Sequence, residues 1–119
     1  MTKKNRLFVP LSTSSFLDFK NGKQYEVRAY GRQFTEKNVY FGRDVELRKG
    51  YSGESIFGSI KEVLMGSLEE IFAQVDFKLI EPRLSSVEEA ILENKNMLGE
   101  KDKYISFQVL LNFNIYFPK

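Results

Sequence analysis

The sequence predicts an α+β fold, a small mixed β-barrel with two or three short helices, formed by a single domain over residues 1–119. The length suits one domain, and a hydrophobic content of 42% is enough to build a core. Alternating apolar and polar residues mark several strands, one of them long. Helix-start signals fall between these strands without the regular strand–helix rhythm of a parallel sheet, which favours α+β.

Five segments have the pattern of strands, and three positions carry helix-start signals. The expected strands lie at residues 6–11, 23–30, 45–48, 55–64 and 105–117. Pro10 places the first strand at a sheet edge or ends it. Hydroxyl side chains at 12–15 predict one or two helical turns. Capping-box patterns predict helices from Ser67 to about Val75 and from Ser85–Ser86 to about Asn96.

Two of these strands carry expectations about which side chains share a face. In the fourth strand, a period of two places Ile56, Gly58, Ile60 and Glu62 together. In the last strand, every second residue from Ile105 to Phe117 is apolar. This pattern predicts one long strand that bends and serves both sides of a small barrel.

Composition excludes several classes of chemistry. The chain has no Cys and no His, which excludes disulfides, thiolate metal sites and histidine-based triads. Any catalysis would depend on carboxylates, Lys, Tyr, Ser or Thr. Acidic residues at the helix starts are explained by the helix dipole, so no metal site is expected. No cofactor is expected either. No apolar run reaches membrane-spanning length and no secretory pattern opens the chain, so we expect a cytoplasmic protein with no membrane partner.

Charge is unevenly distributed along the chain. Residues 1–50 hold 11 Lys/Arg against 5 Asp/Glu, whereas residues 51–119 hold 7 against 11. A basic half points to a polyanionic partner, of which nucleic acid is the commonest. The alternative is an ordinary solvated surface, because folding can scatter these residues over every face.

The densest candidate for a functional site is the segment 21–28. On the expected strand, Glu26 and Arg28 are two residues apart, so their side chains point to the same face about 7 Å apart. The guanidinium would hold Glu26 ionised, and Lys23 could anchor a phosphate or act as a base. The alternative is a surface ion-pair ladder that contributes about 0–1 kcal/mol.

Cations and aromatic residues are interleaved after this segment, around a loop expected at 31–41. The residues concerned are Tyr30, Arg32, Phe34, Tyr40, Phe41, Arg43, Arg48, Lys49 and Tyr51. Cations bind phosphates and aromatic faces stack on unpaired bases, so the loop could cover a nucleic-acid cleft. Tyr30 and Tyr51 stand next to glycines and are expected to be exposed, whereas Phe34 and Phe41 are expected in the core.

Segment 21–28 resembles the signature of the ASCH domain, a relative of the PUA RNA-binding barrel. That signature has a Gly, a Lys two positions on, a Glu or Thr three further, and an Arg two beyond. Asn21, Lys23, Glu26 and Arg28 stand in those places. Asn21 replaces the family's Gly, and Asn also tolerates a left-handed backbone. The similarity covers most of residues 6–113.

The resemblance implies a PUA-like barrel with a cleft beside the motif strand, and RNA or a modified nucleoside as the ligand. One branch of the family resembles a small amidohydrolase that acts on acetylated cytidine with a Lys, a Thr nucleophile and a Glu. Lys23 matches the first of these, whereas Glu26 stands in the place of the Thr. The third role would fall near Glu81. A ribonuclease activity is also compatible with these residues.

Three functions therefore follow as hypotheses. The leading one is RNA or nucleoside binding; the others are a nucleoside amidohydrolase or ribonuclease at the same cleft, and a protein–protein adaptor. The expected ligand contacts are Lys23, Tyr25, Glu26, Arg28, Tyr30, Arg32, Arg48 and Tyr51. A catalytic role would fall to Lys23, Glu26 and Glu81. The sequence leaves the ligand's identity and the oligomeric state open.

Overall fold

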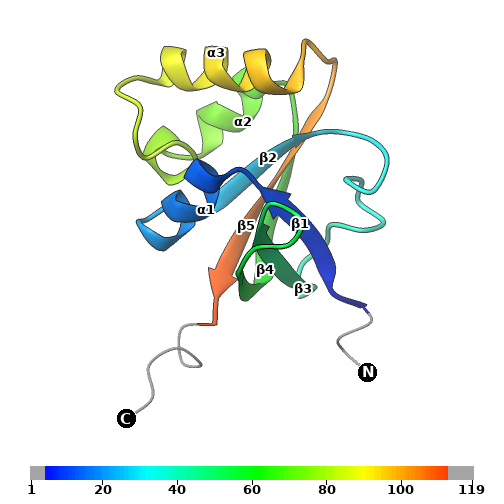
Figure 1. Cartoon of the computed structure of the whole chain (residues 1–119). Coiled ribbons are helices and arrows are strands. Elements are labelled where there is room, and N and C mark those ends of the chain that lie inside the picture. Colours follow the sequence, from blue (N-terminus) through cyan, green and yellow to red (C-terminus); the bar gives the residue numbers. More distant parts are fainter. Residues whose placement is uncertain (1–4, 113–119) are drawn as a thin grey trace.

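The structure, a computed structural model, describes residues 5–112 as a five-stranded sheet curled into a half-barrel, with helices packed on it (Figure 1). The predicted α+β class is confirmed. The elements are β1 (Leu7–Leu11), α1 (Thr13–Lys20), β2 (Tyr25–Ala29), β3 (Asp44–Lys49), β4 (Ser55–Gly66), α2 (Leu68–Gln74), the 3-10 turn η2 (Phe77–Leu79), α3 (Val87–Leu98) and β5 (Tyr104–Leu111).

The strand order is β1-β3-β4-β5-β2, so β1 and β2 are the two edges of the sheet. β1 pairs with β3 in parallel, and every other pair is antiparallel. Pro10 lies in an edge strand, as predicted, because proline cannot donate to a ladder. β1 and β2 do not pair with each other. Their open boundary, called here the seam, is bridged by Arg28, whose Nη2 donates to the Pro10 carbonyl at 2.7 Å.

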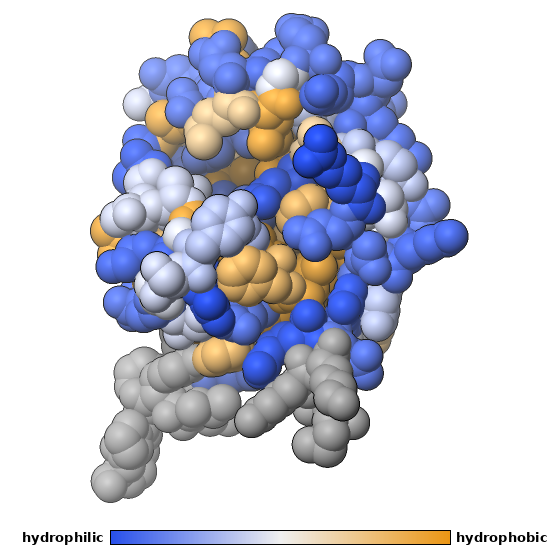
Figure 2. All heavy atoms as spheres, turned by 45° about the vertical axis from the view of Figure 1, so that its right-hand side comes forward, coloured by the Kyte–Doolittle hydropathy of each residue, from blue (hydrophilic) through white to orange (hydrophobic). Residues whose placement is uncertain are grey.

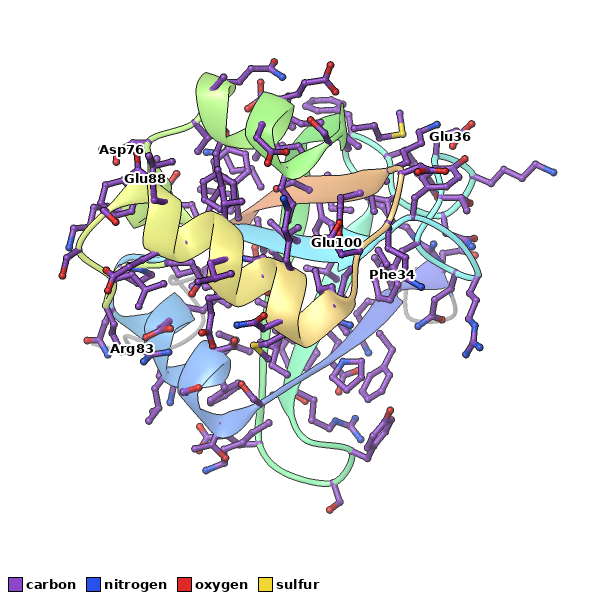
Figure 3. All side chains as sticks on the ribbon, turned by 90° about the horizontal axis from the view of Figure 1, so that it is seen from above. Phe34, Glu36, Asp76, Arg83, Glu88 and Glu100 are labelled. Carbon is purple, nitrogen blue, oxygen red and sulfur yellow. The ribbon has the colours of Figure 1, made fainter. Side chains whose placement is uncertain are left out.

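The sheet packs a hydrophobic core against each of its faces. Inside the curl, Leu7, Val9 and Leu11 of β1 alternate inward and meet Phe16 and Phe19 of α1. On the other face, α2 and α3 cover a second core that includes Tyr25, Val27, Leu68, Ile71, Ala90 and Tyr104. Figure 3 looks onto this helical layer, with α3 lying across the strands. In β2, Tyr25 and Val27 pack into this second core, whereas Glu26 and Arg28 face the other way, because alternate residues of a strand point to opposite sides.

The predicted helix starts are confirmed. Ser12, Ser67 and Ser86 each accept a hydrogen bond from a backbone N–H three residues on. Such caps satisfy amide groups that have no partner within the helix, and each stabilises its helix by about 1 kcal/mol. Among the described residues, we find no helix with the length and apolar character needed to cross a membrane.

The prediction for the second half of β4 is wrong. The register with β5 shifts between Ile60 and Glu62, which forms a β-bulge at Lys61. Glu62 is therefore turned to the outside, and Val63 packs on the inner core in its place. Just before the bulge, Gly58 allows close approach to β5, since an added Cβ would lie 2.4 Å from the Leu110 carbonyl oxygen.

The strand predicted at 105–117 is β5, Tyr104–Leu111, in the part of the chain that the structure describes. β5 ends at Leu111 within the described residues, and residues 113–117 of the expected strand lie outside them. β5 pairs with β4 along one edge and with β2 along the other. Ile105, Phe107 and Val109 all face the inner core, as the alternation predicts.

Candidate functional site

A short turn leads from α1 into β2 and positions the motif side chains. The residue with the left-handed backbone is Gly22, with φ of +116°, whereas Asn21 has φ of −123°. Asn21 instead donates from Nδ2 to the Leu17 carbonyl at 2.9 Å and closes α1. The conformation expected at Asn21 is therefore supplied one position later by glycine.

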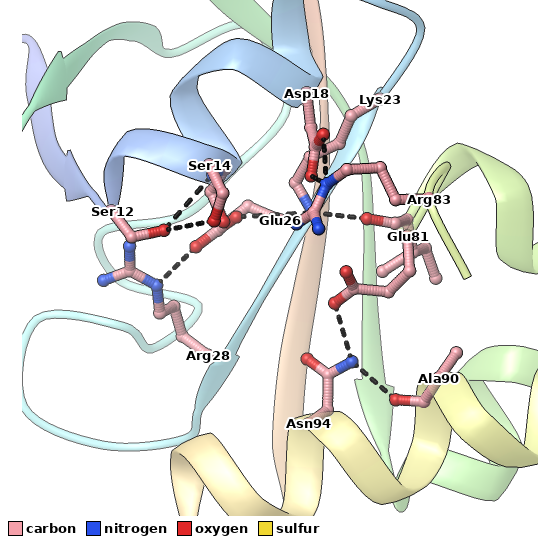
Figure 4. A network of polar contacts seen from close by, with 12 residues as sticks. Ser12, Ser14, Asp18, Lys23, Glu26, Arg28, Glu81, Arg83, Ala90 and Asn94 are labelled. Carbon is pink, nitrogen blue, oxygen red and sulfur yellow. Dashed lines mark hydrogen bonds and ion pairs between the residues drawn. The ribbon is translucent and has the colours of Figure 1, made fainter.

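The structure brings Lys23, Glu26 and Arg28 together in one chain of contacts (Figure 4). The Glu26 carboxylate lies 3.6 Å from Lys23 Nζ and accepts from Arg28 Nε at 2.7 Å. Lys23 Nζ also donates to the Ile80 carbonyl at 2.5 Å, which ties β2 to the segment after η2. Lys23 and Glu26 are only 5% and 7% exposed. This is a buried, mutually compensated set of charges rather than a surface ladder.

Three residues complete this polar region: Glu81 and Arg83 from the connection between η2 and α3, and Asn94 from α3. Glu81 Oε2 accepts from Asn94 Nδ2 at 3.0 Å, and the same nitrogen donates to the Ala90 carbonyl at 2.8 Å. Nearby, Arg83 donates to both carboxylate oxygens of Asp18 on α1, at 2.8 and 3.1 Å. These contacts tie the connection between η2 and α3 to α1 through Arg83 and to α3 through Glu81.

Between α1, β2 and α3 lies a narrow cleft of about 170 Å³. Its lining consists of Ser12, Ser15, Lys23, Glu26, Val27, Arg28, Glu81, Asn94, Met97 and Leu98. The cleft is smaller than a site for a drug-sized molecule, and it has the size of a single planar ring. It offers several acceptor oxygens on one side and the free N–H groups of Arg28 on another.

A wider groove of about 660 Å³ continues along the seam. It shares Arg28 and Leu98 with the cleft and extends past Tyr30, Arg32 and Tyr51. Lys101 adds a further cation to its lining, together with Pro10, Ala29, Gly31, Gln33 and Phe34. Figure 2 brings this side of the molecule forward and shows hydrophobic residues in a hollow among hydrophilic ones.

Two expected ligand contacts lie outside both the cleft and the groove. Tyr25 is on the opposite face of β2, in the core under α2 and α3, where its hydroxyl hydrogen-bonds Glu62. The alternation along β2 requires this, since Glu26 and Arg28 face the other way. Arg48 on β3 contacts Glu46 and donates to the Tyr51 carbonyl at 3.0 Å. Arg48 thus supports the turn that carries Tyr51, rather than lining the groove.

The aromatic residues divide in a way that the sequence predicts only in part. Tyr51 is 78% exposed, as expected next to a glycine, whereas Tyr30 is half-buried with Lys103 Nζ 4.1 Å from its ring centre. Phe34 packs on the inner core and stacks over Phe107. Phe41, however, is 71% exposed, so the expectation that it lies in the core is wrong.

Several lining residues escaped the sequence analysis. Asn94 is the clearest, because it stands one helical turn after Ala90 on the buried side of α3. A polar residue within such an apolar stripe is a signal that could have found it. Ser12, Ser15 and Lys101 come from distant segments, and no local pattern connects them to β2.

The electrostatics of the cleft centre on Glu81. Burial raises the pKa of the Glu81 carboxyl, and the nearby Lys23 ammonium and the Asn94 hydrogen bond offset part of that rise. A carboxyl with a raised pKa can hold or release a proton closer to neutral pH than an exposed one. Within residues 5–112, no three acidic side chains come together as metal ligands would.

Comparison with known proteins gives the fold a context. No family model matches the sequence, and no curated protein matches it. Solved structures do match. The hypothetical protein PH0355 has a TM-score of 0.73 at 15% identity, over 89% of this chain and 98% of that one. Protein PF0455 from Pyrococcus furiosus has a TM-score of 0.66 at 16% identity, over 90% and 97%.

The third comparison bears on the signature in segment 21–28. The ASCH protein from Zymomonas mobilis has a TM-score of 0.58 at 12% identity, over 87% of this chain and 65% of that protein. Identities this low establish the fold alone. That fold is the one expected from Lys23, Glu26 and Arg28, of which Glu26 and Arg28 lie on β2 and Lys23 just before it, all three lining a cleft. The chain therefore has the fold of an ASCH domain.

Proposed function

We propose that this protein is an ASCH-type domain that binds single-stranded RNA, with one base in the cleft and the flanking nucleotides along the groove. The observation that carries the proposal is that these two spaces are neighbours. A narrow polar cleft for one ring shares Arg28 and Leu98 with a wider groove that is lined by cations and aromatic rings. Unpaired bases and a phosphate backbone need this combination.

The groove supplies the sequence-independent part of binding. Arg32 is exposed, and neither Arg32 nor Lys101 has an acidic partner within residues 5–112, so both charges are available to phosphates. Tyr51 presents a largely exposed ring next to them. Stacking on such a ring contributes about 1–3 kcal/mol per base. A single strand rather than a duplex is favoured, because paired bases cannot enter the cleft.

The test is fluorescence anisotropy with end-labelled RNA at several salt concentrations. Wild-type protein should bind single-stranded RNA more tightly than the same sequence as a duplex. Replacing both Arg32 and Lys101 by Ala should weaken binding and reduce the salt slope by about 0.7 for each lost phosphate contact. Lys95→Ala is the matched control, since this lysine faces Glu69 of α2, outside the cleft and the groove. Equal binding by the double variant and the control would overturn the proposal.

Glu81 favours a second candidate function, a hydrolase acting on a nucleoside. Its partly buried carboxyl lines the cleft and has a raised pKa, so it could take a proton from an attacking water. Because Glu26 stands where one branch of the family has its Thr nucleophile, water would have to attack directly. Incubation with modified nucleosides, followed by mass spectrometry, tests this. Product formed by wild type and lost in folded Glu81→Gln protein would establish the enzyme; no product would leave the binding function alone.

A further inference from the structure

We infer that the free edge of β2 is a reading surface, on which the backbone of Val27 and Ala29 hydrogen-bonds the polar edge of the bound base. The inference rests on the proposed RNA binding and adds to it how a base is recognised. The motif side chains are largely committed to one another, so they leave little capacity to discriminate among ligands.

The register between β2 and β5 fixes which backbone groups point into the seam. Tyr30 N–H donates to the Lys103 carbonyl, and the Gln24 carbonyl accepts from Val109 N–H. In an antiparallel pair, hydrogen-bonded residues alternate with residues whose N–H and C=O point away from the partner. Since Tyr30 and Gln24 bond to β5, so do Glu26 and Arg28, which leaves Val27 and Ala29 facing the seam.

These groups lie at the site and are unpaired. Val27 lines the cleft and Ala29 lines the groove. Within residues 5–112, no strand pairs with this edge of β2 and no other hydrogen bond reaches these backbone groups. The edge thus presents alternating donors and acceptors, two residues or about 7 Å apart. A buried backbone group without a partner is costly, so a ligand that pairs with it gains affinity.

Asn94 faces this edge as a polar group of fixed orientation. Both N–H groups of its amide are used, one by Glu81 and one by the Ala90 carbonyl. Its Oδ1 therefore remains as an acceptor, with no donor in the described part of the chain, although the residue is only 7% exposed. A planar ring placed between β2 and Asn94 would meet hydrogen-bonding groups along two of its edges.

The dimensions favour a base over an extended peptide, the other ligand that commonly adds to a free strand edge. An added peptide strand would lie about 4.8 Å from β2, and it would need several consecutive residues of β2 without a strand partner. Arg28 closes the seam to Pro10, and the cleft measures about 170 Å³. A single ring is compatible with both features.

The test is a titration of ¹⁵N-labelled wild-type protein with a short oligouridylate, followed by amide spectra. The amides of Val27 and Ala29 should shift, whereas those of Glu26 and Arg28, which are engaged with β5, should move less. An oligomer of N3-methyluridine keeps its phosphates and stacking faces but loses the N–H of its polar edge. It should bind about tenfold more weakly. Shifts confined to the groove, or equal affinity for both oligomers, would overturn the inference.

Two variants at Ala29 test whether its backbone N–H contributes to ligand binding. Ala29→Pro removes one seam-facing N–H at a sheet edge, where proline is tolerated, and Ala29→Ser keeps it. Only the proline variant should lose affinity, by about tenfold. If wild type does not bind oligouridylate at all, the proposed function itself fails. If an extended peptide rather than the oligomer shifts Val27 and Ala29, the edge serves strand addition and the inference is wrong.

Discussion

The cleft and the groove share Arg28 but are built in opposite ways. In the cleft, each charge of the motif is held by another charge or a carbonyl and is shielded from solvent. In the groove, Arg32 and Tyr51 are exposed and make few contacts with the rest of the protein. This difference separates two kinds of residue. Side chains of the cleft serve both folding and ligand binding, whereas side chains of the groove are free to serve binding alone.

The largest expected effect is on the cleft. Glu26→Ala would leave the buried Lys23 and the partly buried Arg28 without their shared carboxylate, so we expect the free energy of unfolding to fall by about 3 kcal/mol or more. Urea unfolding measures this. Glu54→Ala is the control, because Glu54 also pairs with a lysine, Lys20 at 3.0 Å, but is exposed, so its loss should change the free energy of unfolding far less. If both variants lost a similar free energy of unfolding, the charges of the cleft would be no more important for stability than an exposed ion pair.

The next effect concerns the groove. Tyr51→Ala should weaken single-stranded RNA binding about tenfold, since a stacking surface is lost. The free energy of unfolding should stay within about 0.5 kcal/mol of wild type, because the ring is largely exposed. Anisotropy and urea unfolding on the same sample separate the two quantities. A stability loss comparable to the affinity loss would show that the groove, too, is structural.

The opposite face of β2 sharpens the comparison, since it is buried and should not affect binding. Tyr25→Phe removes the hydrogen bond to Glu62 and should lower the free energy of unfolding by about 1 kcal/mol with no change in RNA affinity. Burial and that hydrogen bond raise the pKa of Tyr25 to about 12. A raised pKa gives stability that is complete below pH 10 and is lost as pH rises towards 12. The gap between wild type and variant should therefore narrow above pH 10.

The smallest effect is that of Glu81. Because burial raises the pKa of its carboxyl, the protonated form favours folding, and this contribution is lost as pH rises through the folded-state value. Glu81→Gln should consequently gain stability relative to wild type as pH rises above 4.5, where the carboxyl of the unfolded chain ionises first. Urea midpoints of both proteins across this range measure the difference. A gap that closes with rising pH would contradict the assigned direction.

Local patterns in the sequence predict much of the fold. The helix starts at Ser12, Ser67 and Ser86 depend on residues within one turn, and the faces of β2 depend only on alternation. The bulge at Lys61 could not be predicted in this way, because it arises from the register that β4 adopts against β5. The sequence of β4 gives no sign of the extra residue, because the bulge is a shift in which residue of β5 each residue of β4 pairs with.

The site shows the same division. Segment 21–28 contributes Lys23, Glu26 and Arg28: strand spacing predicts the contact of Glu26 with Arg28, and the signature adds Lys23 from the turn before β2. Tyr25 was included by its place in the motif, although the same spacing puts it on the other face. Asn94 and Lys101 join the site only through the packing of α3 and the connection to β5, which no local pattern specifies.

The central claim is that one RNA strand occupies the cleft and the groove together, and cross-linking tests it most directly. Single-stranded RNA containing 4-thiouridine is irradiated with the protein, and the cross-linked peptides are identified by mass spectrometry. Cross-links should fall on Tyr51 and on Met97 or its neighbours in α3. Phe41 is a built-in control, because it is nearly as exposed as Tyr51 but lines neither space. Cross-links concentrated at Phe41, and absent from Tyr51 and α3, would contradict the account.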